Sequence, residues 1–280
     1  MAPSARLPSP DGGRPEPGPT EQVLTGGLAG AGRVVRIGDT VRRPAGPYSP
    51  AVHALLTHLE RVGFEGTPRF LGVDGQGRSI VDYRDGDVAM PPYPAWSADD
   101  DLFDSVAELQ RRYHQAVATF DPDPALTWNP LLAQPDPHAQ HSRLLVGHND
   151  LCLENVVVRD GRAVALIDFD MAAPVERAWD LAVALRHWAP VRADGDLGER
   201  TGVDRVTRWH RWLDIHEVGA AERARVVELT GEFLALALRR MGERAAAGEP
   251  AYVTAWQAGY RQQNQGAQQW LATHRHQLVA

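Results

Sequence analysis

A short ribbon inside a mainly helical half of the chain most constrains its fold. Two apolar strands, Val156–Val158 and Val164–Ile167, are separated by an Asp-Gly turn. Antiparallel strands joined by a tight turn pair residue by residue. We therefore expect Asn155, just before the first strand, and Asp168, just after the second, to lie side by side.

A third oxygen-bearing side chain, Asp150, sits on the loop just upstream of this ribbon. Two carboxylates and one amide oxygen should therefore meet at one end of the two strands. Hard oxygen ligands of this kind suit Mg²⁺, which keeps several waters and takes further ligands from the phosphates of a nucleotide. The sequence thus predicts a magnesium site that opens toward a phosphate-bearing ligand.

The chain divides into a strand-rich part and a helical part. Residues 23–87 show two strands, one amphipathic helix with Ser49 as N-cap, and two more strands; residues 88–280 are mainly helical. We expect an α+β protein of two lobes with these bounds, joined by the segment from Tyr83 to Asp87, with the ligand in the cleft between them. In the second lobe, Ser97 is the expected cap of a long helix to about Phe120, and further helices are predicted at 175–187, 204–218, 221–247 and 251–274.

The first 22 residues are rich in Pro, Gly and Ser and are predicted to form a disordered tail. Prolines and glycines also interrupt the continuous apolar run that a secretory signal needs. No stretch approaches the roughly 20 apolar residues that cross a bilayer. The expectation is a soluble, cytoplasmic protein with no membrane partner.

All 29 basic residues are arginine, so the chain contains no lysine. This excludes a Walker-type phosphate loop and a Schiff-base lysine, and any cationic phosphate contact must come from arginine. The net charge of −7 argues against a nucleic-acid partner. The single cysteine, Cys152, excludes an intramolecular disulfide and a multi-cysteine metal centre.

The ribbon and its flanks resemble the catalytic segment of the protein-kinase-like fold, and most of all that of the aminoglycoside phosphotransferase family of small-molecule kinases. The residues that carry the resemblance are His148, Asp150, Asn155 and, across the hairpin, Asp168. The segment Glu176–Ala182 resembles the helix that follows in that family and carries an aspartate, Asp180. Asp170 stands where protein kinases have a glycine, which favours the small-molecule branch. The resemblance covers about residues 23–189.

The resemblance implies a role for each of these residues. Asp150 corresponds to the catalytic aspartate, which accepts the proton of the substrate hydroxyl as the γ-phosphoryl group of ATP is transferred. Asn155 and Asp168 correspond to the Mg²⁺ ligands, and His148 to the histidine that braces the catalytic loop. The implied partners are a nucleotide and a small-molecule hydroxyl acceptor.

The same resemblance implies a nucleotide site in the first lobe. Arg42 and Arg43 lie on the strand that supplies a phosphate-holding lysine in the family. Strand alternation places Arg43 on the same face as Val41, so we predict Arg43 in this role, with Arg42 as the alternative. Tyr83 is also expected to contact the nucleotide. Three glycines before the first strand resemble the flexible loop that covers the phosphates, namely Gly26, Gly27 and Gly30.

One departure concerns the partner of that cation. The helix that should offer a glutamate has Val52 and His53 in its first turn, and Glu60 lies too far along. This helix therefore offers no glutamate at the place that the usual ion pair requires. Arginine stays charged without such a partner and can bind phosphate in a bidentate manner.

The acceptor stays open at this stage, as do ATP against GTP and the oligomeric state. An aminoglycoside is favoured by family analogy alone, and choline or an amino alcohol would serve equally. Trp209 and Trp212, three apart, are expected in a buried helical stripe rather than in a cation-binding cage. Seven acidic residues could line a pocket for a polycationic sugar, although such residues more often lie on solvated faces: Asp194, Asp196, Glu199, Glu217, Glu222, Glu228 and Glu232.

Two functions from other classes compete with transfer. A non-catalytic nucleotide-binding scaffold could keep the fold without the lysine–glutamate pair, but such a binder has little need of Asp150. A metal-dependent hydrolase could use His148 and the carboxylates, but the sequence lacks a second clustered histidine pair.

Overall fold

The computed structural model describes residues 21–24, 34–137 and 144–280. The predicted tail therefore lies outside the described part, except for its last two residues, Glu21 and Gln22. The N-terminal lobe is built from β1 (Gln22–Val23), β2 (Val35–Ile37), β3 (Thr40–Pro44), α1 (Ser49–Arg61), β4 (Phe70–Val73) and β5 (Arg78–Asp82).

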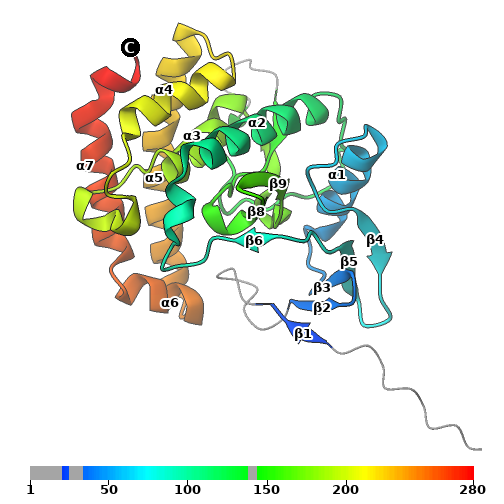
Figure 1. The fold of residues 1–280 in the computed structure, drawn as a ribbon. Coiled ribbons are helices and arrows are strands. Elements are labelled where there is room, and N and C mark those ends of the chain that lie inside the picture. Colours follow the sequence, from blue (N-terminus) through cyan, green and yellow to red (C-terminus); the bar gives the residue numbers. More distant parts are fainter. Residues whose placement is uncertain (1–20, 25–33, 138–143) are drawn as a thin grey trace, which may run out of the picture.

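The strands of this lobe form one antiparallel sheet in the order β1-β2-β3-β5-β4 (Figure 1). The predicted order of two strands, a helix and two strands is confirmed, and β1 adds a short edge strand before them. Gly38 makes the turn between β2 and β3 with φ of +57°, a left-handed conformation that glycine adopts without strain. The register pairs Arg43 with Ser79, which fixes the face on which the Arg43 side chain lies.

The predicted cap of α1 is displaced by one residue. Tyr48 is the N-cap and already has helical backbone angles, so Ser49 is the first residue of the helix rather than its cap. The Ser49 hydroxyl instead accepts a hydrogen bond from the backbone N–H of Gly46 at 2.9 Å. The preceding loop therefore uses this hydroxyl for its own closure, which leaves none for the helix terminus.

The C-terminal lobe is mainly helical. Its helices are α2 (Asp100–Val117), α3 (Arg177–Trp188), α4 (Arg205–Ile215), α5 (Ala220–Ala246), α6 (Pro250–Gln257) and α7 (Tyr260–Leu278). In this lobe α5 packs against α3, α6 and α7. The single helix predicted at 251–274 is wrong, because Gly259, with φ of +96°, ends the helical backbone and separates α6 from α7.

The cap of α2 also differs from the prediction. Asp99, not Ser97, is the N-cap, and its carboxylate accepts hydrogen bonds from the N–H groups of Asp101 at 2.8 Å and Leu102 at 3.1 Å. A charged acceptor at this position also interacts favourably with the helix dipole. Ser97 lies in the short 3₁₀ turn Ala95–Ala98 that precedes the helix.

Two small sheets lie within the helical lobe. A three-stranded antiparallel sheet has the order β6-β8-β9, and a two-stranded sheet pairs β10 with β7. The β8–β9 ribbon is the one predicted from the sequence, whereas β6, β7 and β10 were not expected. In Figure 1, β6 follows the N-terminal lobe and lies beside β8, and α2 packs on β9. The strands are β6 (Asp87–Val88), β7 (Leu145–Gly147), β8 (Val156–Arg159), β9 (Arg162–Leu166) and β10 (Ala173–Val175).

Large aromatic side chains fill the core of the helical lobe. Trp179, Trp209 and Trp212 have no exposed surface, so the prediction of a buried stripe for the latter two is confirmed. The Phe103 and Trp212 rings meet edge to face, with centroids 5.2 Å apart, which joins α2 to α4. Within the described residues, no helix has the length and apolar character needed to span a membrane.

Candidate active site

The β8–β9 ribbon brings Asn155 and Asp168 together. Val156 pairs with Leu166, and the backbone oxygen of Asn155 accepts a hydrogen bond from the N–H of Ile167 at 2.9 Å. Asp168 follows directly and adopts a left-handed conformation with φ of +62°, which is uncommon for a residue other than glycine. Strained backbone of this kind recurs at functional sites, where it redirects a side chain.

Asp150 lies against Asn155. The Asn155 side-chain amide donates to the backbone oxygen of Asp150 at 2.8 Å and to its carboxylate at 3.1 Å. Burial raises the pKa of Asp150 to about 8, and the nearby charges of Asp168 and Glu154 add to this effect. A raised pKa makes the ionised form of this carboxylate a stronger base toward a substrate hydroxyl. The three oxygen-bearing side chains therefore meet, as the ribbon predicts.

The donor set suits a hard divalent cation. Both Asn155 amide hydrogens face Asp150, and the Asn155 side-chain oxygen makes no hydrogen bond within the described part of the chain. One carboxylate oxygen of Asp168, Oδ2, is likewise free of hydrogen bonds to described residues, while Oδ1 is taken by Arg43. An amide oxygen and a carboxylate oxygen are thus available to Mg²⁺.

His148 supports this loop from behind rather than facing a ligand. The side chain is fully buried, its ring packs against Phe169 with centroids 4.5 Å apart, and Nε2 donates to the backbone oxygen of Ile167 at 2.9 Å. Burial lowers its pKa, so the ring is neutral near pH 7. Its contacts are those of a positioning residue.

Asp180 fixes the backbone immediately before Asp150. Its buried carboxylate accepts hydrogen bonds from the N–H of Asn149 at 2.8 Å, from His114 Nε2 at 2.7 Å and from Gln110 Nε2 at 2.9 Å. Burial alone would raise the pKa of Asp180, but the hydrogen bond and charge of His114 outweigh it and lower the pKa. The sequence singles out Asp180 on its helix, but not the two partners on α2.

Arg43 projects from β3 to this cluster. Its Nη1 and Nη2 both donate to Asp168 Oδ1 at 3.1 Å, and Nη2 also donates to Asp170 at 2.5 Å. Arg42 points to the other face, where it binds the Thr40 hydroxyl at 2.5 Å and lies 3.8 Å from the carboxylate of Asp74. The alternation of the strand thus directs Arg43, and not Arg42, toward Asp168.

Arg43 pairs with two carboxylates that follow β9 rather than with a glutamate on α1. His53, on α1, is used elsewhere: its Nε2 lies 2.8 Å from the Ser79 hydroxyl and its ring stacks on Phe70 at 3.9 Å. The carboxylates that hold Arg43 are Asp168 and Asp170. Burial would lower the pKa of Arg43, but these two charges raise it. Sequence reasoning did not identify Asp170 as a partner, although its place in Asp-Phe-Asp was the available signal.

Two cavities meet at Asn155 and Asp168. The sheet-side cavity, of about 380 Å³, is lined by β3, β5 and the ribbon, and includes Arg43 and Tyr83. The helix-side cavity, of about 570 Å³, includes Asp150 and continues between α3, α5 and α7. Residues shared by both cavities are Met90, Glu154, Asn155 and Asp168. The three-oxygen cluster therefore stands where the two spaces join.

Of the predicted nucleotide-binding residues, only Arg43 and Tyr83 lie within the described part of the chain. Tyr83 lines the sheet-side cavity, and the Arg36 guanidinium lies 3.6 Å from the centre of its ring. Gly26, Gly27 and Gly30 lie outside the described residues. Leu24 and Val34, which flank that segment, both line the sheet-side cavity.

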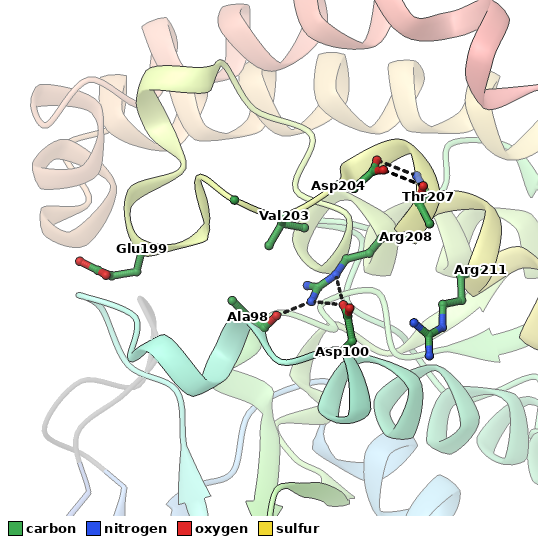
Figure 2. Close-up of a pocket in the computed structure, with 9 residues that line it drawn as sticks. Ala98, Asp100, Glu199, Val203, Asp204, Thr207, Arg208 and Arg211 are labelled. Carbon is green, nitrogen blue, oxygen red and sulfur yellow. Dashed lines mark hydrogen bonds and ion pairs between the residues drawn. The ribbon is translucent and has the colours of Figure 1, made fainter.

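A third cavity, of about 310 Å³, lies apart from these groups, between the start of α2 and the start of α4. Figure 2 shows the Arg208 guanidinium bonded to the backbone oxygen of Ala98 and to the carboxylate of Asp100. Of the residues proposed from the sequence, only Glu199, one of the seven acidic candidates, lines it, and none of the predicted catalytic, metal or nucleotide-binding residues does. Because Arg208 is already paired with Asp100, we interpret this cavity as part of the packing between α2 and α4 rather than as a ligand site.

A family profile and one relative match this chain by sequence. Residues 94–213, which contain Asp150, Asn155, Asp168 and Asp180, match the sequence profile of APH, described as a phosphotransferase enzyme family. The trifolitoxin immunity protein of Rhizobium leguminosarum bv. trifolii is 31% identical over 273 residues, which cover 93% of this chain and 98% of that protein.

Solved structures show the fold. A choline/ethanolamine kinase family protein from Mesorhizobium loti superposes with a TM-score of 0.63 at 18% identity, covering 93% of this chain and 92% of its own. An aminoglycoside phosphotransferase from Alicyclobacillus acidocaldarius gives 0.52 at 17% identity, covering 88% and 89%. The predicted two-lobed, protein-kinase-like α+β fold is confirmed.

Proposed function

Because the chain belongs to the phosphotransferase enzyme family, in the protein-kinase-like fold, we propose that it transfers the γ-phosphoryl group of ATP, bound with Mg²⁺, to a hydroxyl group of a small molecule. The observation that carries this proposal is the meeting of Asp150, Asn155 and Asp168 where the two cavities join. The sheet-side cavity would receive the nucleotide and the helix-side cavity the acceptor.

In this proposal, each polar side chain has a separate task. Asn155 and Asp168 would hold the metal, which supplies neutralisation of the phosphate charge when bound. Asp150 orients the acceptor hydroxyl and takes its proton. The bond between the γ-phosphorus and the β–γ bridging oxygen breaks, a bond to the acceptor oxygen forms, and ADP leaves with the electron pair.

We expect Arg43 to bind the nucleotide phosphates in place of the absent lysine. Replacing Arg43 with methionine removes the described cation closest to Asp168 in the sheet-side cavity, and we expect ATP affinity to fall about tenfold to a hundredfold, as for loss of a charge-assisted hydrogen bond. The matched control is Arg42→Met, on the same strand but turned to Asp74, which should leave ATP affinity within about twofold. Calorimetric titration with MgATP measures both, and equal losses in the two variants would reject the role of Arg43.

Asp168 should carry the dependence on Mg²⁺. We expect Asp168→Asn to remove the gain in ATP affinity that Mg²⁺ gives the unmodified chain, because a neutral amide is a weaker ligand than a carboxylate. Asparagine tolerates the left-handed backbone at this position, so the change tests charge rather than folding. Asp160→Asn, at the exposed turn of the same ribbon with φ of +52°, is the control; ATP titrations with and without Mg²⁺ that give the same gain in both variants would count against the metal site.

A protective role is the second candidate. The relative named for immunity to trifolitoxin matches nearly the whole chain, which supports the proposal that the acceptor is a toxic compound and that its phosphorylation protects the cell. Growth of a trifolitoxin-sensitive strain in the presence of trifolitoxin distinguishes protection by phosphorylation from protection by binding alone. Protection by the unmodified chain but not by Asp150→Asn is expected; protection by both would indicate sequestration without transfer.

A further inference from the structure

Two arginines of the helix-side cavity form no ion pair with the residues that the structure describes. Arg186 is in the last turn of α3, and Arg192 is on the loop that follows; both line the cavity and both are half-buried. Neither makes an ion pair within the described residues, whereas Arg205 and Arg208, on the next helix, pair with Asp194 and Asp100. The cavity therefore presents two arginine side chains that could bind a negatively charged ligand.

The few contacts these arginines do make are with uncharged groups. Arg186 Nη1 lies 3.1 Å from His187 Nε2, and its guanidinium stands 5.6 Å from the centre of the Phe233 ring. The Arg192 guanidinium makes no hydrogen bond to the residues that the structure describes. Behind them the buried Arg200 donates to the backbone oxygen of His187 at 2.7 Å, which adds a third positive charge to the same end of α3.

The positive groups at this end of α3 lie close enough to repel one another. Burial, together with the charge of Arg186, lowers the pKa of Arg192, and the opposing charges of Asp196 and Glu154 do not outweigh these effects. Burial and the charge of Arg192 lower the pKa of Arg200 to about 10. Burial and the same neighbours hold the pKa of His187 well below its usual value, so this ring is neutral near pH 7. An anion entering the cavity would relieve this repulsion.

The acidic groups of the cavity, Asp150, Glu154 and Asp168, each accept at least one hydrogen bond from a residue other than Arg186 and Arg192. Glu154 accepts a hydrogen bond from the Tyr93 hydroxyl at 2.8 Å, Asp168 is paired with Arg43, and Asp150 accepts one from Asn155. A polycationic acceptor that reached this end of the cavity would have to place its amines beside two guanidiniums that form no ion pair with described residues. The rest of the wall is largely apolar and includes Leu132, Val191, Phe233, Ala237 and Met241.

We propose that the acceptor is an anionic hydroxyl compound with an apolar body, whose carboxylate or equivalent oxyanion is held by Arg186 and Arg192 while its hydroxyl faces Asp150. This inference rests on the proposed function and specifies its substrate class. It runs against the amino-sugar and choline-like acceptors that family analogy favours. Guanidinium groups suit this task because they bind oxyanions through paired hydrogen bonds.

The test is the charge preference of the cavity, measured by binding alone. Lactate, 3-hydroxybutyrate and 3-phenyllactate are each compared with the primary amide and with the amine in which an aminomethyl group replaces the carboxylate, by calorimetric titration of the full chain. We expect the acid to bind at least about tenfold more tightly than its amide in the best triplet, and the amine more weakly still. An amine or amide that binds as well as the acid in every triplet, or no binding by any acid, would overturn the proposal.

Variants locate the preference. Arg192→Gln should reduce the acid's affinity about tenfold or more, while Arg162→Gln, at an exposed position at the start of β9, should not change it; circular dichroism establishes that both are folded. A loss of MgATP affinity instead of acid affinity in Arg192→Gln would assign this arginine to the nucleotide and reject the inference. Failure of phosphoryl transfer would be read separately, in Asp150→Asn, because binding of the acid requires no chemistry.

Discussion

Replacing Asp150 with asparagine is expected to lower the rate of phosphoryl transfer about a thousandfold, within the range measured for loss of a general base. The asparagine side-chain oxygen can still accept the hydrogen bond that Asn155 donates at 3.1 Å, but an amide cannot take the proton of an acceptor hydroxyl. ATP affinity should stay within about twofold, because Asp150 lines the helix-side cavity and not the sheet-side one. Single-turnover transfer read by mass, beside an ATP titration, measures both quantities.

The same experiment separates the enzyme from a scaffold. Equal transfer by the unmodified chain and by Asp150→Asn would reject the role of Asp150 as the base. Stabilisation of the unmodified chain by MgATP, with no transfer to any hydroxyl compound, would favour the non-catalytic nucleotide binder. Loss of transfer together with loss of ATP affinity would show that Asp150 contributes to the nucleotide site instead.

Removing the Asp180 carboxylate should produce the largest loss of stability. Asp180→Ala leaves His114, Gln110 and the N–H of Asn149 buried without their shared acceptor. Breaking a buried charged pair of this kind costs about 3–5 kcal/mol. At about 2–4 °C per kcal/mol for chains of comparable size, the unfolding temperature should fall by roughly 10 °C. Chemical denaturation and thermal unfolding measure the two quantities independently.

The control for this prediction is Asp214→Ala. The Asp214 side chain is 67% exposed and pairs with Arg223 at the surface, where an ion pair contributes about 0–1 kcal/mol. A loss in Asp180→Ala no larger than in Asp214→Ala would show that the buried network does not stabilise the fold. Transfer should fall as well in Asp180→Ala, because Asn149 positions the backbone of Asp150.

The stabilisation by Asp180 should also depend on pH. Although burial raises its pKa, the hydrogen bond from His114 and the charge on that ring lower it below the ordinary value. A carboxyl group with a depressed folded-state pKa contributes stability above its unfolded pKa and loses it as the pH falls through the folded-state value. The unmodified chain should therefore lose stability below about pH 4 more steeply than Asp180→Asn, measured by denaturant unfolding at a series of pH values.

The parts of the site governed by local geometry could be predicted from the sequence. A tight turn fixes the register of β8 and β9, so Asn155 and Asp168 had to share one end of the ribbon. Strand alternation likewise separates Arg43 from Arg42. The order of elements in the N-terminal lobe followed from apolar periodicity and turn residues.

The parts of the site that depend on tertiary contacts could not be predicted from the sequence. Asp170 reaches Arg43 only because the strand leaves the ribbon through the left-handed Asp168, and sequence spacing does not show that turn. Arg186 and Arg192 become cavity residues through the packing of α3 on α5. The acidic residues beyond position 190, which the sequence offered as a pocket for a polycation, do not line the helix-side cavity. Their spacing along the sequence does not show which of them would face the helix-side cavity.

The central claim is that one cluster at the junction of two cavities receives the metal and both substrates. A crystal structure of the full chain with Mg²⁺ and an unreactive ATP analogue tests it most directly. We expect the metal between the side chains of Asn155 and Asp168, the adenine ring beside Tyr83, and the γ-phosphate directed toward Asp150 and the helix-side cavity. A metal bound elsewhere, or a γ-phosphate directed away from Asp150, would contradict it.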